Sequence, residues 1–177
     1  MTERVEPSLI SYEKLSDSHL EVIKLFQNQE KDLVDFLQED ALENQRRGVS
    51  VTYLFFIQEN ESKLAGYITL LSDSIEIRQN KELQHAFENK GIGYKTLPAL
   101  KIGRMATDTG FQRRGVATAM IKFAISLALD TSVVVGCRFV IVDAKPAAEE
   151  FYLKKGFKPL KEDHSKPEQM YLDLFLR

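Results

Sequence analysis

Gln112-Arg113-Arg114-Gly115-Val116-Ala117 is the most informative segment of the chain. It follows an apolar, strand-like run at Leu100–Thr107 and opens a long helical pattern at Val116–Asp130. The first backbone N–H groups of a helix have no partner within it and lie at the positive end of its dipole. Because Gly115 has no Cβ, a phosphate can approach this turn closely. The pattern therefore predicts an anion site that is shaped for a diphosphate.

Other kinds of phosphate-binding loop do not fit the sequence. It contains neither G-x-x-x-x-G-K-[ST] nor a G-x-G-x-x-G that follows a strand. Gly91-Ile92-Gly93 has no apolar run before it, and Pro98 follows closely. We therefore expect a flexible loop there.

Hydrophobic periodicity predicts the order of helices and strands. Apolar residues from Val116 to Leu127 recur at helical spacing, whereas Phe139–Val142 is uninterrupted, as in a strand that is covered on both faces. The predicted strands are Leu9–Tyr12, Val51–Ile57, Leu64–Leu70, Leu100–Thr107, Arg138–Val142 and Met170–Leu176. The predicted helices lie after Asp17-Ser18, at about Lys31–Arg46 and Lys81–Glu88, at Val116–Asp130, and from Pro146 to a left-handed cap at Gly156.

A second block of sequence agrees with the first. Ala148-Glu149-Glu150-Phe151-Tyr152-Leu153-Lys154-Lys155-Gly156-Phe157 reads A-x-x-F-Y-x-x-x-G-F, and residues 112–117 read Q/R-x-x-G-x-G/A. Together the two blocks resemble the signatures of the GNAT N-acetyltransferase superfamily, over roughly residues 50 to 177. The resemblance implies a single α/β domain of α+β type over residues 1–177. Its central sheet would be mixed and largely antiparallel, with about six to seven strands splayed at the cofactor site and about four flanking helices.

The same resemblance implies a binding site for acetyl-CoA. The pantetheine arm would pair with main-chain groups near Met105, Ala106 and Thr107. The diphosphate would accept backbone N–H groups from the turn, and arginine side chains there could add charge-assisted contacts. The residues of this turn are Arg113, Arg114, Gly115, Val116, Ala117 and Thr118.

Tyr152 is the candidate catalytic residue. When an amine attacks a thioester, charge develops on the carbonyl oxygen and then on the leaving thiolate, so a nearby hydroxyl lowers the barrier as hydrogen-bond donor or general acid. The residues alone favour a simpler interpretation of Phe151 and Tyr152, as one packed and one surface aromatic residue, and the match to the family motif reverses this preference. Many family members have Asn where this chain has Lys145, which leaves one side-chain contact to the cofactor open.

No general base is assigned. Asp108 and Asp143 lie near the ends of two predicted strands, but carboxylates there equally suit helix caps. An amine with a low pKa, such as the α-amino group of an aminoacyl ester, needs no protein base.

Bulk properties predict a soluble, cytoplasmic enzyme. The chain has 177 residues, of which 44% are hydrophobic and 28% charged, as in ordinary globular domains. Cys137 is expected to be a buried thiol, and His19, His85 and His164 are scattered in polar surroundings, so no metal site is expected. Met1–Pro7 does not resemble a signal peptide, and no stretch of about 18 apolar residues is expected to cross a membrane.

Charge is distributed unevenly along the chain. Residues 78–114 carry eight basic and three acidic side chains, a net charge of +5, whereas the others sum to −7. Either this segment meets an anion such as coenzyme A, or it is an ordinary solvated surface.

Three functions fit these observations. The first is an N-acetyltransferase that transfers the acetyl group of acetyl-CoA directly to an amine-bearing acceptor in a ternary complex. The acceptor would be a small amine, a polyamine or a protein N-terminus. The second follows from Asp35-Phe36-Leu37, the Ala41 helix and the long insertion before Leu100, which resemble the acetyltransferase toxins of toxin–antitoxin pairs. That resemblance implies a tRNA substrate, a homodimer and an antitoxin partner. The third is a non-catalytic CoA-binding module.

Overall fold

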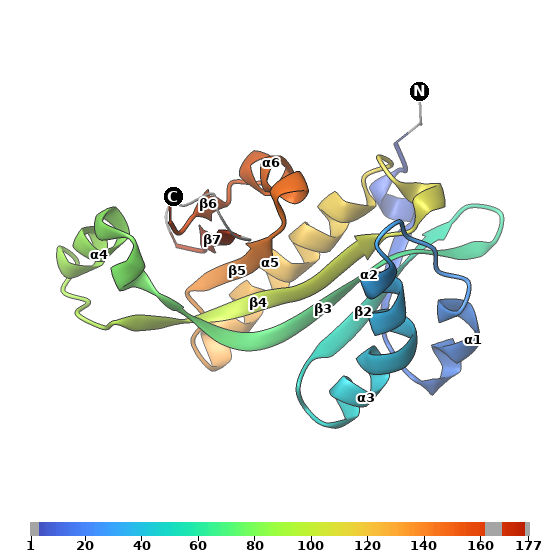
Figure 1. Cartoon of the computed structure of the whole chain (residues 1–177), viewed down its shortest axis with the longest axis horizontal. Coiled ribbons are helices and arrows are strands. Elements are labelled where there is room, and N and C mark those ends of the chain that lie inside the picture. The colour runs from blue at the N-terminus through green and yellow to red at the C-terminus, as the bar shows by residue number, and fades with distance from the viewer. Residues whose placement is uncertain (1–3, 162–167, 176–177) are drawn as a thin grey trace. The chain divides into compact units, whose positions relative to one another are not determined.

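The computed structural model describes residues 4–161 and 168–175. The chain divides into two compact units. The first comprises Met1–Leu71 and Gly103–Phe123, and the second comprises Ser72–Ile102 and Ala124–Arg177. Figure 1 shows the helices and strands of the chain.

The strands follow the order β1-β2-β3-β4-β5-β7-β6. The β4–β5 pair is parallel, whereas β1–β2, β2–β3, β5–β7 and β6–β7 are antiparallel. The expected mixed, largely antiparallel sheet is therefore confirmed. The strands are β1 (Ile10–Lys14), β2 (Val51–Gln58), β3 (Ser62–Glu76), β4 (Thr96–Thr107), β5 (Phe139–Ala144), β6 (Lys158–Pro159) and β7 (Glu168–Asp173).

In the first unit, short helices cover one face of the antiparallel strands β1, β2 and β3. They are α1 (Leu20–Ile23), α2 (Lys31–Asp35) and α3 (Ala41–Arg46), and Figure 1 shows them gathered beside β2. Their inward residues, including Ile23, Leu37 and Ala41, share one core cluster with Leu54 and Tyr67 of the strands. Removing these apolar side chains from water is what holds the helices on the sheet.

The predicted helix at Lys31–Arg46 is interrupted by a π-helical segment, Phe36–Asp40. Tyr67 lies under this segment: its hydroxyl donates to the Leu33 carbonyl oxygen at 2.7 Å, and its ring stacks with Phe36. Burial raises the pKa of Tyr67, so the hydroxyl remains a donor. Periodicity could not predict the interruption, because it depends on a hydrogen bond from a distant strand.

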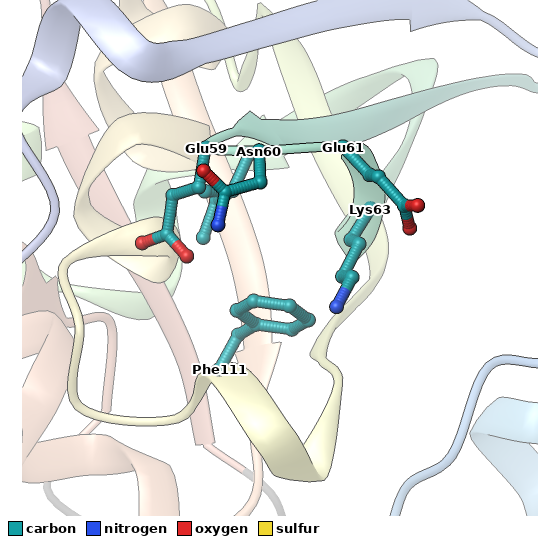
Figure 2. Close-up of a pocket in the computed structure, with 6 residues that line it drawn as sticks. Glu59, Asn60, Glu61, Lys63 and Phe111 are labelled. Carbon is teal, nitrogen blue, oxygen red and sulfur yellow. The ribbon is translucent and has the colours of Figure 1, made fainter.

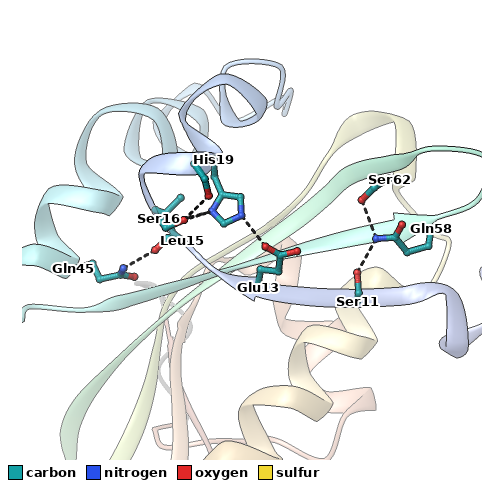
Figure 3. A network of polar contacts seen from close by, with 9 residues as sticks. Ser11, Glu13, Leu15, Ser16, His19, Gln45, Gln58 and Ser62 are labelled. Atoms are coloured by element: carbon teal, nitrogen blue, oxygen red, sulfur yellow. Dashed lines mark hydrogen bonds and ion pairs between the residues drawn. The ribbon is translucent and has the colours of Figure 1, made fainter.

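His19 belongs to the capping box of a short 3-10 helix, Asp17–His19, which directly precedes α1, and Figure 3 shows its contacts. The Ser16 backbone N–H donates to Nδ1 of His19 at 3.0 Å, and Nε2 lies 3.0 Å from Glu13 Oε2. Since Nδ1 accepts, Nε2 carries the proton and donates to the carboxylate. His19 is only 9% exposed, and both of its ring nitrogens contact polar partners. Cys137 is buried, as expected, and no group of ligands that could hold a metal is found among the described residues.

Helix α5 (Val116–Val134) corrects the expectation about membrane-length stretches. It is long and apolar enough to cross a membrane by length and composition, because Lys122 and Asp130 are its only charged residues. In the first unit, side chains of α5 instead pack against aromatic residues of β1 and β2. The ring of Phe123 lies 4.5 Å from that of Tyr12 and 4.7 Å from that of Tyr53, measured between centroids.

In the second unit, the long connection expected from Asp73 to Pro98 is largely strand. β3 continues to Glu76 and β4 begins at Thr96, so the two strands form an arm that carries α4 (Lys81–Glu88) at its tip. Leu83 and Phe87 of α4 share a core cluster with Phe139 and Tyr171. The helix was predicted with these bounds, whereas the strand extensions were not.

Helix α6 (Pro146–Lys154) begins at the predicted proline, and Gly156 has the predicted left-handed conformation. The closing strand was predicted at Met170–Leu176 and is observed at Glu168–Asp173, while Leu176 lies outside the described residues. The short β6 was not predicted, since two residues carry too little pattern.

Arg138 and Asp173 form an ion pair that stabilises the second unit. Arg138 Nη2 donates to Asp173 Oδ2 at 2.8 Å, and the Asp173 side chain is only 3% exposed. The guanidinium also lies 5.0 Å from the ring centroids of Phe87 and Phe175. Replacing Arg138 would therefore leave a buried carboxylate without this partner.

We expect Arg138→Ala to lower the free energy of unfolding by about 1.5 to 3 kcal/mol, the range for hydrogen bonds to charged groups. Urea denaturation followed by circular dichroism measures this change. Lys154→Ala is the control, because it breaks an exposed ion pair with Glu150 and should leave the stability unchanged. Equal effects of the two substitutions would contradict the structural role of the Arg138 pair.

Candidate active site

The turn between β4 and α5 lies in the first unit. Asp108 caps a short 3-10 helix, Thr109–Phe111, by accepting from the Gly110 N–H at 2.9 Å. Arg113 (φ 62°) and Gly115 (φ 96°) both have positive φ, and these two residues bend the chain into α5. The Gly115 carbonyl accepts the Ala119 N–H at 3.1 Å, which makes Gly115 the residue that precedes the first helical turn. The predicted strand–turn–helix is confirmed.

The end of β4 is held closely against β3. A Cβ on Gly66 would lie 2.8 Å from the Ala106 carbonyl oxygen, so only glycine permits this approach. The Asp108 N–H donates to the Ala65 carbonyl at 2.8 Å, and Asn28 Nδ2 donates to the Thr107 carbonyl at 2.8 Å. The pantetheine contacts expected at Thr107 would therefore have to use its remaining groups.

The β4–β5 ladder ends before the residues predicted to meet the pantetheine arm. Its last pair is Ile102 with Val142. Met105, Ala106 and Thr107 follow on β4 in the first unit.

Both carboxylates considered as general bases are engaged in other interactions. Asp108 Oδ2 accepts the Gln27 N–H at 2.8 Å, in addition to its cap on Gly110, so the capping alternative is confirmed. Asp143 Oδ2 lies 2.7 Å from Lys101 Nζ, and Asp73 pairs with the same lysine at 3.3 Å. Burial alone would lower the pKa of Lys101, but the two carboxylates raise it above its ordinary value.

Tyr152 is buried in the second unit. It lies on α6 with 5% of its surface exposed, and its ring packs edge-on against Phe151 and Phe157 at centroid distances of 5.3 and 5.4 Å. Burial raises the pKa of Tyr152 to about 12. The phenol is therefore fully protonated near neutral pH, which is the form that a proton donor requires.

Arg114 is turned toward the β2–β3 hairpin. It forms an ion pair with Glu59, and its guanidinium lies 5.6 Å from the centroid of Phe111. Phe111 and Glu59 line a hollow of about 300 Å³ with Asn60, Glu61 and Lys63, as Figure 2 shows.

A larger pocket of about 430 Å³ lies beside the end of β4 in the first unit. Its walls combine apolar side chains with amides and one pair of opposite charges, because Lys31 Nζ and Asp35 form an ion pair along α2. The residues that line it are Phe26, Gln27, Asn28, Gln29, Lys31, Val34, Asp35 and Thr109. A pocket of this size admits a small side chain and an amine.

Comparison with known proteins identifies the family. Residues 21–168 match the acetyltransferase (GNAT) domain. The chain belongs to the GNAT acetyltransferase family. It is therefore an N-acetyltransferase that takes its acetyl group from acetyl-CoA. The expectation drawn from residues 112–117 and 148–157 is confirmed.

Several solved structures share this GNAT fold over nearly their whole length. AtaT complexed with acetyl-methionyl-tRNAfMet is 24% identical, with a TM-score of 0.79, covering 93% of this chain and 94% of that one. A tyrosine-to-phenylalanine variant of KacT is 22% identical, with a TM-score of 0.81 and coverage of 94% and 95%. A similar variant of AtaT, bound to the C-terminus of the antitoxin AtaR and to acetyl-CoA, is 21% identical, with a TM-score of 0.74 and 94% coverage of each chain.

The GNAT site residues predicted from sequence fall into both units. Met105, Ala106, Thr107 and the turn from Arg113 to Thr118 lie in the first, and Tyr152 lies in the second. Lys145, where many relatives have Asn, immediately precedes α6 and is exposed.

Sequence reasoning missed Arg4, which lies against the turn. A Cβ on Gly115 would lie 3.6 Å from Arg4 Cγ, and the Val5 N–H donates to the Arg114 carbonyl at 3.0 Å. No motif includes residues so far from residue 112. The charged start of the chain was considered only in the question of whether it resembles a signal peptide, which it does not.

Proposed function

We propose that this GNAT enzyme acetylates the amino group of an aminoacyl-tRNA. The observation that carries the proposal is the match over at least 93% of both chains to AtaT, which was solved with acetyl-methionyl-tRNAfMet. The pocket lined by Phe26 and Val34 supports it, because an apolar wall suits an amino acid side chain.

Different residues of this chain bind the cofactor and donate the proton in the reaction. Acetyl-CoA supplies the acetyl group as a thioester. The N–H groups from Arg113 to Thr118 bind the diphosphate, while main-chain groups of Met105, Ala106 and Thr107 bind the pantetheine arm. The amine forms the new C–N bond with the acetyl carbon, and the C–S bond then breaks. The Tyr152 phenol gives its proton to the departing sulfur, the amine loses one proton to solvent, and the phenolate takes a proton back from solvent, so that the enzyme returns to its starting state.

The proposal explains why no protein base is needed. Asp108 is engaged by two backbone N–H groups, and Asp143 by Lys101. An α-amino group has a lower pKa than a lysine or polyamine ammonium, so a far larger fraction of it is neutral near pH 7. An ordinary polyamine or lysine would need a base to reach the same state.

The partners follow from the same likeness. AtaT and KacT were solved with antitoxins or as antitoxin–DNA complexes, so we propose an antitoxin partner for this chain and growth arrest in its absence. We further propose that residues 1–177 act as one N-acetyltransferase domain, as a homodimer, in the cytoplasm and without a membrane partner. The family match supports a single domain, because it runs through both compact units.

Acetyl transfer from labelled acetyl-CoA to a panel of acceptors tests the acceptor. We expect label in aminoacyl-tRNAs, and none in uncharged tRNA or in tRNA whose amino acid is already N-acetylated. Because tRNA phosphates would meet the basic side chains of residues 78–114, the apparent affinity for tRNA should fall steeply with salt. Transfer to polyamines or peptides, with none to charged tRNA, would instead support the small-amine alternative.

A further inference from the structure

The first described residues of the chain are anchored on the β4–α5 turn. The Val5 N–H donates to the Arg114 carbonyl at 3.0 Å, and the Val5 side chain is only 7% exposed. A backbone hydrogen bond and a buried side chain together fix this segment on the turn. Its position is therefore part of the fold of the first unit.

This anchor places Arg4 beside Gly115. A Cβ built on Gly115 would lie 3.6 Å from Arg4 Cγ and 3.7 Å from Arg4 Nε, which is ordinary contact distance. The space left open by the missing Cβ is the space through which a phosphate reaches the turn. The side chain of Arg4 thus borders the place where the proposed function puts the diphosphate.

Ion pairing distinguishes Arg4 from Arg114, the arginine next to Gly115 within the turn. Arg114 forms an ion pair with Glu59 and packs on Phe111. Within residues 4–161 and 168–175, Arg4 has no ion-pair partner. A guanidinium binds phosphate oxygens through two parallel N–H groups, so an arginine at this position would gain a charge-assisted contact when a phosphate arrives.

We propose that Arg4 is a cofactor-binding residue that contacts a phosphate of acetyl-CoA. The proposal rests on the proposed function, since it takes the turn as the diphosphate site. Arg4 supplies a cation from outside the signature motif, and the Val5 anchor holds it there. If Arg4 instead blocked the turn and had to move away before the cofactor could bind, Arg4→Gln would bind acetyl-CoA more tightly than the unmodified protein.

Calorimetric titration of Arg4→Gln with three acetyl donors tests the proposal. We expect acetyl-CoA to bind about tenfold more weakly than to the unmodified protein, as for loss of one charge-assisted contact, and Arg4→Lys to recover part of the loss. S-acetylpantetheine has neither the diphosphate nor the 3′-phosphate, so its affinity should not change. Acetyl-dephospho-CoA identifies the phosphate: a loss that persists assigns Arg4 to the diphosphate, and a loss that disappears assigns it to the 3′-phosphate.

The control is Arg47→Gln, which removes an exposed arginine of the first unit that lies outside residues 78–114 and pairs with Glu43, and it should leave all three affinities unchanged. Unchanged or tighter binding of acetyl-CoA by Arg4→Gln would overturn the proposal, as would an equal loss with S-acetylpantetheine, which would indicate a folding defect. Failure of the unmodified protein to bind acetyl-CoA would instead refute the proposed diphosphate site itself. The two failures are therefore distinguishable.

Discussion

Replacing Tyr152 with phenylalanine is expected to lower kcat by about 10²- to 10⁴-fold, the usual contribution of a general acid. The substitution removes one oxygen atom and keeps the ring that packs against Phe151 and Phe157. Acetyl-CoA affinity should change little, because the diphosphate and pantetheine contacts are assigned to other residues. Steady-state transfer of labelled acetyl, with the affinity measured separately, gives both quantities.

Tyr94→Phe is the matched control for this substitution. Tyr94 is 73% exposed and has no assigned role, so loss of its hydroxyl should leave kcat unchanged. A Tyr152→Phe enzyme with undiminished kcat would remove Tyr152 from the mechanism and would favour binding without catalysis, or a different proton donor. In cells, the active protein should arrest growth and Tyr152→Phe should relieve the arrest.

The pH dependence provides an independent check on Tyr152. Because burial disfavours the phenolate, the pKa of about 12 keeps the proton on the oxygen throughout the neutral and mildly alkaline range. We expect no fall in kcat from this residue below about pH 10, the ordinary pKa of tyrosine. A fall centred near pH 8 that disappears in Tyr152→Phe would show that the phenol ionises there, contrary to its burial.

Placing a carboxylate in the turn should have the second large effect. We expect Gly115→Asp to weaken acetyl-CoA binding by about 100-fold or more, because two like charges about 4 Å apart near a protein surface repel by about 4 kcal/mol. A side chain is strained at the 96° of this position, and because Asn carries the same strain as Asp, the Gly115→Asn variant corrects for it. Calorimetric titration with acetyl-CoA measures the loss.

Two controls separate charge from shape. Gly115→Asn has nearly the same size and the same tolerance of positive φ, so it should lose about tenfold in affinity through bulk alone. Gly136→Asp introduces the same carboxylate at another positive φ, in the second unit and with open space around it, and should not affect binding. Equal losses for Gly115→Asp and Gly115→Asn would contradict an anionic ligand at the turn.

Local sequence was sufficient wherever one element carries its own signals. Helix α6 was bounded by Pro146 and Gly156, and α4 by its apolar spacing, and both were observed where they were predicted. The turn at 112–117 was recognised because strand, glycine and helix are contiguous there. Family membership followed from two such local blocks.

Features that depend on distant contacts could not be predicted. The π-helical segment is accompanied by a hydrogen bond from Tyr67, the strand extensions of the arm by packing around Phe139, and the position of Arg4 by a bond from Val5 to Arg114. Each joins residues that are far apart in sequence. The pocket beside Thr109 is of the same kind, because Phe26 and Asp35 reach it from separate segments.

A crystal structure of the protein with acetyl-CoA tests the central claim most directly. We predict that the diphosphate oxygens of acetyl-CoA lie about 2.7 to 3.2 Å from backbone nitrogens between Arg113 and Thr118, within ordinary hydrogen-bond distance. A diphosphate bound elsewhere, with these nitrogens facing only water, would contradict it.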